Sequence, residues 1–183
     1  MVKVRSNIPG RLPKELSGLD GTIGIGTVTD PYQYAEKRFK LTQKCLFILN
    51  ERDFRIHLHT KSDLVLRDME LLASMRGEVG ITVTSIEDRY SKITEPGAPL
   101  PSKRLEALKQ LTSAGIDTYA LIGPVLNHLE GKEEDFVNAV ASTGVKRVYI
   151  DALNPRPLLM ERLNRMNIRG SETSKEKIRQ FAM

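Results

Sequence analysis

Short runs of β-branched and other apolar residues, each bounded by turn residues, recur along the chain. Their composition predicts five β-strands, at residues 22–28, 54–60, 79–84, 118–122 and 146–150. Between the strands lie segments whose apolar residues recur at steps of three and four, the spacing of one helical face. These segments predict amphipathic helices at residues 34–50, 62–75, 101–114 and 133–143.

Glycine and proline mark the ends of the predicted helices. Gly77, Gly115 and Gly144 each follow a predicted helix, where a residue with a left-handed backbone is common. Pro101 opens a helix, where its missing N–H group costs no hydrogen bond. Strands that alternate with helices form right-handed crossovers, so the pattern predicts an α/β fold with a parallel sheet. Such units curve either into an open doubly wound sheet or into part of a barrel.

Composition narrows the class of protein. The chain has 183 residues, 40% of them hydrophobic and 28% charged, which is typical of a globular domain. No apolar run approaches the roughly 20 residues of a membrane span, and the first residues do not resemble a signal peptide. We therefore expect a cytoplasmic protein with no membrane partner. Cys45 is the single cysteine, which excludes a cysteine-rich metal site made by this chain alone.

The net charge is +5, and most of it lies near the end of the chain. We divide the chain into a body at residues 1–155 and a basic helical tail at residues 156–183. Such a tail suits phosphate groups, so nucleic acid is one candidate partner. The alternative is a solvated surface helix, because acidic residues interrupt the basic ones. The basic residues are Arg156, Arg162, Arg165, Arg169, Lys175, Lys177 and Arg179.

Polar side chains collect where the predicted strands end. Parallel α/β folds bind their ligands in the loops at the carboxyl ends of the strands, so these side chains are the candidate site. The candidates after the first three strands are Gly26, Thr27, Thr29, Asp30, Tyr32, Gln33, Thr60, Lys61, Thr84 and Ser85. We expect the largest polar cleft to be lined by Thr27, Asp30, Tyr32, Lys61, Ser85 and Asn154.

Several candidates have simpler explanations. Gly24 and Gly26 let a ligand approach the strand backbone, or they make room for a neighbouring helix. Asp30 and Pro31 form the start of a helix in the simpler interpretation, with Asp30 as its cap. Lys61 suits a carboxylate or phosphate group, or it is an ordinary surface lysine.

Two further features carry weaker signals. His57 and His59 alternate on a predicted strand, but no third metal ligand is evident beside them, so no metal site is predicted. Cys45 lies beside the apolar stripe of its helix, with Leu41 and Ile48 at helical spacing. We interpret it as a buried structural thiol.

The loop after the first predicted strand reads Gly26-Thr27-Val28-Thr29-Asp30-Pro31-Tyr32-Gln33 and is followed by Glu36. Other short segments come in a characteristic order: Thr60-Lys61-Ser62, Leu66-Arg67-Asp68, Glu95-Pro96, Arg104-Leu105 and Ala114-Gly115-Ile116. In combination these segments resemble the radical S-adenosylmethionine superfamily, in its spore photoproduct lyase-like branch, which is often described as DNA repair photolyase-like. The resemblance covers roughly residues 2–123.

This resemblance implies a partial TIM-type (βα) barrel at residues 1–155. The core of the family has six strands, of which this chain would carry the second to the sixth and lack the first. It implies the cofactor S-adenosylmethionine (AdoMet), cleaved to a 5′-deoxyadenosyl radical by a 4Fe–4S cluster on a Cys-x-x-x-Cys-x-x-Cys loop. The loop at residues 26–33 would contact the methionine end of AdoMet. The remaining edge of the cofactor would be lined by Thr60, Lys61, Thr84 and Ser85.

The chain departs from the family at the cluster, because its single cysteine lies in a predicted helix. The expected function is therefore the core of a lyase-like radical enzyme whose cluster-binding cysteines are not in this chain. The alternative is a cluster-less remnant that acts as a ligand-binding or interaction module. A missing first strand would leave the strand at residues 22–28 as an edge that is open, covered by residues 2–5, or paired in a homodimer.

Overall fold

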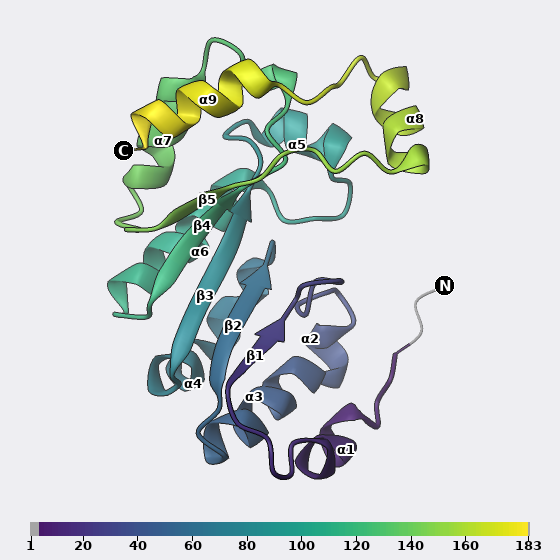
Figure 1. Cartoon of the computed structure of the whole chain (residues 1–183), viewed down its shortest axis with the longest axis vertical. Coiled ribbons are helices and arrows are strands. Elements are labelled where there is room, and N and C mark those ends of the chain that lie inside the picture. Colours follow the sequence, from purple (N-terminus) through teal and green to yellow (C-terminus); the bar gives the residue numbers. More distant parts are fainter. Residues whose placement is uncertain (1–3, 183) are drawn as a thin grey trace.

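A computed structural model describes residues 4–182 as one five-stranded sheet flanked by helices (Figure 1). The strands are β1 (Thr22–Ile25), β2 (Arg55–Thr60), β3 (Gly77–Val83), β4 (Thr118–Ile122) and β5 (Val148–Ile150). All neighbours pair in parallel, and the spatial order follows the chain order. The predicted α/β partial barrel is thereby confirmed.

Helices α3, α4 and α6 cover one face of the sheet, and α5, α8 and α9 lie beyond the carboxyl ends of the strands (Figure 1). Two of the predicted helices are divided. Lys40 has a φ of 50° and separates α2 from α3, while η1 is a 3₁₀ helix that precedes α4. The helices are α1 (Ile8–Glu15), α2 (Glu36–Phe39), α3 (Leu41–Glu51), η1 (Asp63–Asp68), α4 (Met69–Ser74), α5 (Asp88–Thr94), α6 (Pro101–Ser113), η2 (Asn127–Leu129), α7 (Glu133–Ala141), α8 (Pro157–Arg165) and α9 (Glu172–Phe181).

The two faces of the sheet differ in polarity. Along β2, Ile56 and Leu58 are buried in the main hydrophobic core, while the alternating His57 and His59 belong to the opposite, polar face. On that face the ring of Tyr119 lies over Gly80, where an added Cβ atom would stand only 2.0 Å from the ring. The concave inner side of the partial barrel is thus polar, whereas its outer side packs on helices.

Strand β1 forms one edge of the sheet, because among the described strands it pairs with β2 alone. This confirms the expected edge position. The strand ends at Ile25, three residues earlier than predicted, and the chain then enters a loop. Of the segment expected to cover this edge, residues 2 and 3 lie outside the described residues.

The end of the chain packs on the body through both of its helices. Ile178 of α9 is fully buried in the main core, and the hydroxyl of Ser174 donates to Glu133 of α7 at 2.8 Å. Leu163 of α8 packs with Leu126 and belongs to a smaller cluster. In the part of the chain that the structure describes, no helix is long and apolar enough to cross a membrane.

Candidate functional site

Asp30 fastens the loop after β1 to the end of β2. Its carboxylate accepts three hydrogen bonds, from the backbone N–H of Tyr32 at 2.9 Å, the hydroxyl of Thr60 at 2.6 Å and the backbone N–H of Lys61 at 2.7 Å. The first helix after this loop begins at Glu36, so Asp30 does not cap a helix as the simpler interpretation held. Instead it holds two neighbouring strand ends together.

Position 26 requires glycine for two reasons, its backbone conformation and the closeness of a neighbouring strand. Its φ is +95°, and an added Cβ atom would lie 2.0 Å from the carbonyl oxygen of His59. The close approach that glycine permits at this position is therefore to the backbone of β2. Neither of the two sequence-based explanations, a ligand or a neighbouring helix, foresaw this close approach of the loop to β2.

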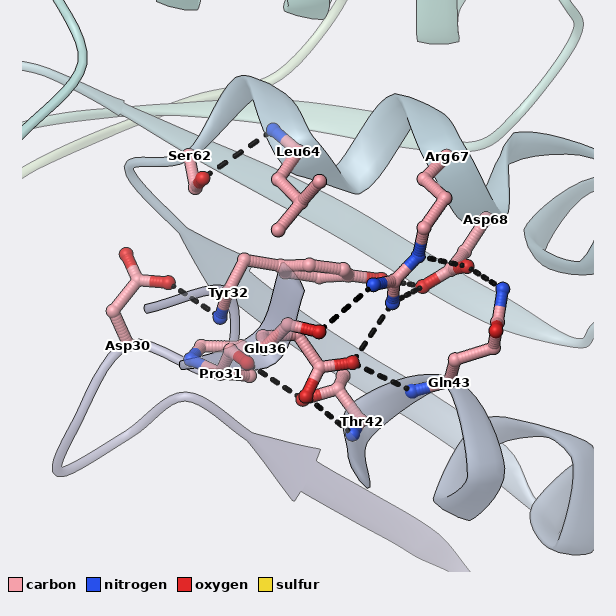
Figure 2. A network of polar contacts seen from close by, with 10 residues as sticks. All are labelled: Asp30, Pro31, Tyr32, Glu36, Thr42, Gln43, Ser62, Leu64, Arg67 and Asp68. Carbon is pink, nitrogen blue, oxygen red and sulfur yellow. Dashed lines mark hydrogen bonds and ion pairs between the residues drawn. The ribbon is translucent and has the colours of Figure 1, made fainter. Parts of the chain in front are cut away.

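A buried polar network anchors the same loop through the side chain of Tyr32 (Figure 2). The hydroxyl of Tyr32 donates to Asp68 at 3.0 Å, and Asp68 also accepts from Gln43 at 2.5 Å and from Arg67 at 2.7 Å. Arg67 bridges onward to Glu36 at 2.8 Å. Burial, together with Asp68, raises the pKa of Tyr32 well above its usual range, so the phenol stays protonated and donates. Tyr32 is thus an anchor of the loop.

The carboxylate of Glu36 also starts the next helix. It accepts from the backbone N–H of Thr42 at 3.0 Å, in the first turn of α3. The hydroxyl of Thr42 donates to the carbonyl of Pro31 at 2.6 Å, so the first turn of α3 is also bonded to the loop. These contacts explain why the predicted helix at residues 34–50 is divided, since Glu36 supplies an acceptor for the free N–H groups of α3.

A second charged cluster lies where β2 and β3 end. Glu95 pairs with Lys61, accepts the hydroxyl proton of Thr84 at 2.7 Å and pairs with Arg104 at 2.8 Å. Burial would raise the pKa of Glu95, but the cations Lys61 and Arg104 outweigh it and hold that pKa below its usual range. Lys61 is therefore already paired. Sequence reasoning did not single out Glu95 and Arg104 as site residues, although both belong to segments used for the family resemblance.

Two cavities open at the carboxyl ends of the strands, and both are lined by Lys61 and Ala98. We call them the loop cavity and the α8 cavity. The loop cavity has a volume of about 410 Å³ and is lined by Asp30, Tyr32, Gln33, Tyr34, Lys37, Lys61, Ser62, Asp63, Gly97, Ala98 and Pro99. The α8 cavity has a volume of about 360 Å³, and its walls include Thr84, Tyr90, Glu95, Leu126 and Leu163.

Only three of the six residues expected to line one cleft share a cavity in the structure. Asp30, Tyr32 and Lys61 line the loop cavity, whereas Thr27, Ser85 and Asn154 line neither cavity. Ser85 is 1% exposed, and its hydroxyl accepts the backbone N–H of Glu87 at 2.9 Å. Thr27 and Asn154 are exposed. The predicted cleft therefore has to be corrected at these three positions. It is also not the largest, since a polar cavity of about 440 Å³ lies at the opposite ends of the strands, beside Thr22 and Arg55.

The remaining predicted site residues occupy the same rim. Gln33 lines the loop cavity and Thr84 lines the α8 cavity, while Thr60 is buried in its bond to Asp30. Thr29 is exposed on the loop that contains Gly26.

The two strand histidines are joined by Tyr119. Its hydroxyl lies 2.9 Å from Nε2 of His57 and 3.2 Å from Nδ1 of His59. The other ring nitrogens face Glu78 at 2.7 Å and Thr82 at 2.5 Å. Within the described residues, no group of three or more histidine, cysteine or acidic residues is placed to hold a metal ion.

Cys45 lies half-buried on α3. Burial and the nearby Glu36 raise the pKa of its thiol, which disfavours the thiolate that ligates iron. An iron–sulfur cluster of the family type needs three such thiolates, and this chain has one cysteine. The residues present therefore do not fit that cluster.

Comparison with known proteins places this arrangement in a family. The model of the radical SAM superfamily matches residues 20–140, so the chain belongs to that superfamily. An uncharacterized protein of Methanocaldococcus jannaschii is 36% identical over 144 residues, covering 75% of this chain and 54% of that protein. An uncharacterized protein of Mycobacterium tuberculosis is 30% identical over 165 residues, covering 85% of this chain and 48% of that protein. The chain thus spans about half the length of these relatives.

Solved structures share the fold. Spore photoproduct lyase complexed with dinucleoside spore photoproduct has a TM-score of 0.60 at 16% identity, and the match covers 90% of this chain and 51% of that one. A mutant of spore photoproduct lyase with bound AdoMet and dinucleoside spore photoproduct gives a TM-score of 0.59 at 14% identity. The resemblance inferred from the sequence is thereby confirmed at the level of family and fold.

Proposed function

We propose that this chain is the AdoMet- and substrate-binding core of a lyase-like radical enzyme whose cluster-binding cysteines are not in the chain. The observation that carries the proposal is the loop at residues 26–33, which Asp30 fixes to the end of β2 beside the loop cavity at the carboxyl rim. Membership of the radical SAM superfamily supports it. A neighbour with the same fold has AdoMet bound.

The side chains of the loop cavity suit the methionine end of AdoMet. Lys37, Gln33 and Ser62 line it and offer donors for a carboxylate, and Asp63 offers an acceptor for an ammonium group. The volume of about 410 Å³ lies within the usual range for small-molecule sites. When bound, AdoMet supplies the 5′-deoxyadenosyl group. In this proposal the predicted cofactor residues have two roles. Asp30, Tyr32 and Thr60 position the loop, whereas Gln33 and Lys61 face the cavity.

Isothermal titration calorimetry with AdoMet tests this proposal on the purified chain. We expect a saturable site, and we expect Asp30→Asn to weaken it about tenfold or more, because the loop loses its tie to β2. Asp53→Asn is the matched control, since Asp53 is exposed and pairs with Arg76 away from the cavities. No AdoMet binding by the wild-type chain, or equal losses in the two variants, would contradict the proposal.

A second candidate function is a cluster-less ligand-binding module, which the single cysteine favours. It predicts binding without any radical chemistry, because no cluster would ever be supplied. Reading the coding DNA immediately upstream of the Met1 codon separates the two candidates. An in-frame Cys-x-x-x-Cys-x-x-Cys favours the enzyme, and a stop codon favours the module.

Nucleic acid is the partner that the basic tail suggested. Several of its cations are already paired in the structure: Arg165 with Glu161, Lys175 with Glu172, Arg179 with Glu176 and Lys177 with Glu133. These pairs weaken the field available to phosphates, and we propose at most a modest contribution from the tail. Fluorescence titration with single- and double-stranded DNA at two salt concentrations tests this, and equal, negligible binding would remove nucleic acid from the proposal.

A further inference from the structure

The α8 cavity differs in character from the loop cavity. Its walls come from the end of β3, from α5, from the loops after β4 and β5, and from α8. Most of the side chains that line it are apolar: Pro96, Ala98, Pro124, Leu126, Leu153, Leu159 and Leu163. A cavity with this lining favours the flat or branched apolar part of a small molecule.

The charges around this cavity do not balance. Lys61 and Arg162 line it, and Arg104 reaches its wall through Glu95, which is the one carboxylate in the group. The side chain of Arg104 is fully buried, and its Nη2 atom has no hydrogen-bond partner among the described residues. Arg162 on α8 donates only to the carbonyl of Ile93, at 3.3 Å, among the hydrogen bonds of the described residues. Two cations and one anion thus line the cavity, and the buried Arg104 behind Glu95 adds a third positive charge.

A polar atom is also available within the apolar wall. Tyr90 lines the cavity, and its ring stacks on that of His128 at 3.6 Å between centroids. Its hydroxyl is buried and has no hydrogen-bond partner among the residues that the structure describes. Burial lowers the pKa of His128 to about 4, so this neighbour is neutral near pH 7. A ligand atom that accepts from Tyr90 would satisfy the buried hydroxyl.

We infer that the α8 cavity binds an anionic molecule with an apolar ring, its ring against the leucines and its acidic group toward Arg162. The excess positive charge favours an anion, whereas AdoMet, with its sulfonium and ammonium groups, has a net positive charge. The inference rests on the proposed function, because it names the substrate class that would lie beside the cofactor across Lys61. The acidic group is a carboxylate or a phosphate.

The probe 1-anilinonaphthalene-8-sulfonate, an aromatic ring system with one sulfonate, tests the cavity directly by fluorescence titration of the full chain. We expect Arg162→Gln to weaken its binding about fivefold and to reduce its salt dependence. Arg165→Gln is the matched control, because Arg165 lies on the same helix, is paired with Glu161 and does not line the cavity. Equal affinities for the two variants would overturn the inference.

A second pair of variants tests the apolar wall. Leu159 lines the cavity, whereas Leu158 is 83% exposed and does not. We expect Leu159→Asp to abolish probe binding, because it places a carboxylate against the anion, and Leu158→Asp to leave binding within about twofold. Thermal unfolding of both variants establishes that they remain folded. Undiminished binding by a folded Leu159→Asp protein would overturn the inference.

Displacement of the probe identifies the source of the acidic group. Displacement by indole-3-acetate supports a carboxylate, displacement by thymidine 5′-monophosphate supports a phosphate, and displacement by neither overturns the inference. Calorimetry with AdoMet on the same protein keeps the two proposals separate. AdoMet binding without probe binding contradicts only the inference on the α8 cavity, and probe binding without AdoMet binding contradicts only the proposed function.

Discussion

The hydroxyl of Thr60 donates to the carboxylate of Asp30 across 2.6 Å, joining the last residue of β2 to the loop that follows β1. The same hydroxyl oxygen accepts the backbone N–H of Ser62 at 2.9 Å. Thr60 is 1% exposed, so both bonds are shielded from water. Thr60 therefore holds the loop with the family sequence and is itself no longer free to contact a ligand.

Replacing Thr60 with valine removes both bonds while keeping the shape of the side chain. We expect Thr60→Val to lower the free energy of unfolding by about 1–3 kcal/mol, because a half-buried carboxylate and a buried N–H each lose a partner. Thr29→Val is the control, since Thr29 is exposed, and it should change stability by less than about 0.5 kcal/mol. Urea denaturation measures both. Equal costs would show that the bond between Thr60 and Asp30 does not stabilise the fold.

The anchor beneath the loop allows a double-mutant cycle. Asp68 has a fully buried side chain that pairs with Arg67 and accepts the hydroxyl proton of Tyr32. We expect Asp68→Ala to cost about 3–5 kcal/mol, because Arg67 loses one of its two counter-ions and the donors of Tyr32 and Gln43 lose their acceptor. Tyr32→Phe should cost about 1–3 kcal/mol alone and much less in the Asp68→Ala background. Additive costs in urea denaturation would show that the two residues do not act as one unit.

Much of the fold follows from sequence periodicity, because buried strands and amphipathic helices repeat at different spacings. The strand at residues 118–122 matches β4 residue for residue. The helix predicted at residues 34–50 is interrupted at Lys40, since the side chain of Glu36 caps α3, and a capping contact from six residues away leaves no periodic signal. Helix α1 was not predicted, because Pro9, Gly10 and Pro13 are typical helix breakers.

The candidate site could be located from the sequence but not resolved into its parts. The rule that ligands bind at the carboxyl ends of parallel strands pointed to the rim where Asp30 and Lys61 line the loop cavity. It did not show that Ser85 turns inward to accept the N–H of Glu87, because a hydroxyl at a strand end suits either a ligand or a local turn. The partners Glu95 and Arg104 are distant along the chain from β2, and only the folded chain brings them to Lys61.

His128 makes stability depend on pH. Burial lowers its pKa in the folded protein from 6.5 to about 4, and the unfolded chain therefore binds the proton more readily. The stability contributed by the neutral ring is fully present above about pH 6.5 and is lost as the pH falls towards 4. We expect a loss of about 1–3 kcal/mol from this group, allowing for partial exposure.

His128→Phe tests this directly, because phenylalanine retains the stacking on Tyr90 and cannot titrate. Urea denaturation at pH 7 and pH 4.5 gives the loss of stability for each protein, and the carboxylates common to both cancel in the difference. We expect the variant to lose about 1–3 kcal/mol less than the wild type. The same pH dependence in both proteins would show that His128 is not buried in its neutral form.

Iron binding is the sharpest test of the cysteine argument. We expect reconstitution of this chain with iron and sulfide under argon to give no stable 4Fe–4S cluster, because Cys45 supplies one thiol whose pKa is raised by burial. Iron analysis and the broad absorption near 400 nm, a general mark of such clusters, are the measurements. A stable cluster with several irons per chain would contradict this expectation.

The open edge at β1 is a candidate interface between two copies of the chain. Strand β1 pairs with β2 on one side only, among the strands that the structure describes, and Thr22 and Gly24 are exposed. Unpaired backbone groups along such an edge recruit another strand, and a lysine on the edge opposes this pairing. If the chain forms a dimer through β1, sedimentation equilibrium will show an association that Thr22→Lys weakens and Ser17→Lys, the same charge change on an exposed loop residue, does not. A monomer at every concentration, or equal effects of the two lysines, would rule out pairing through β1.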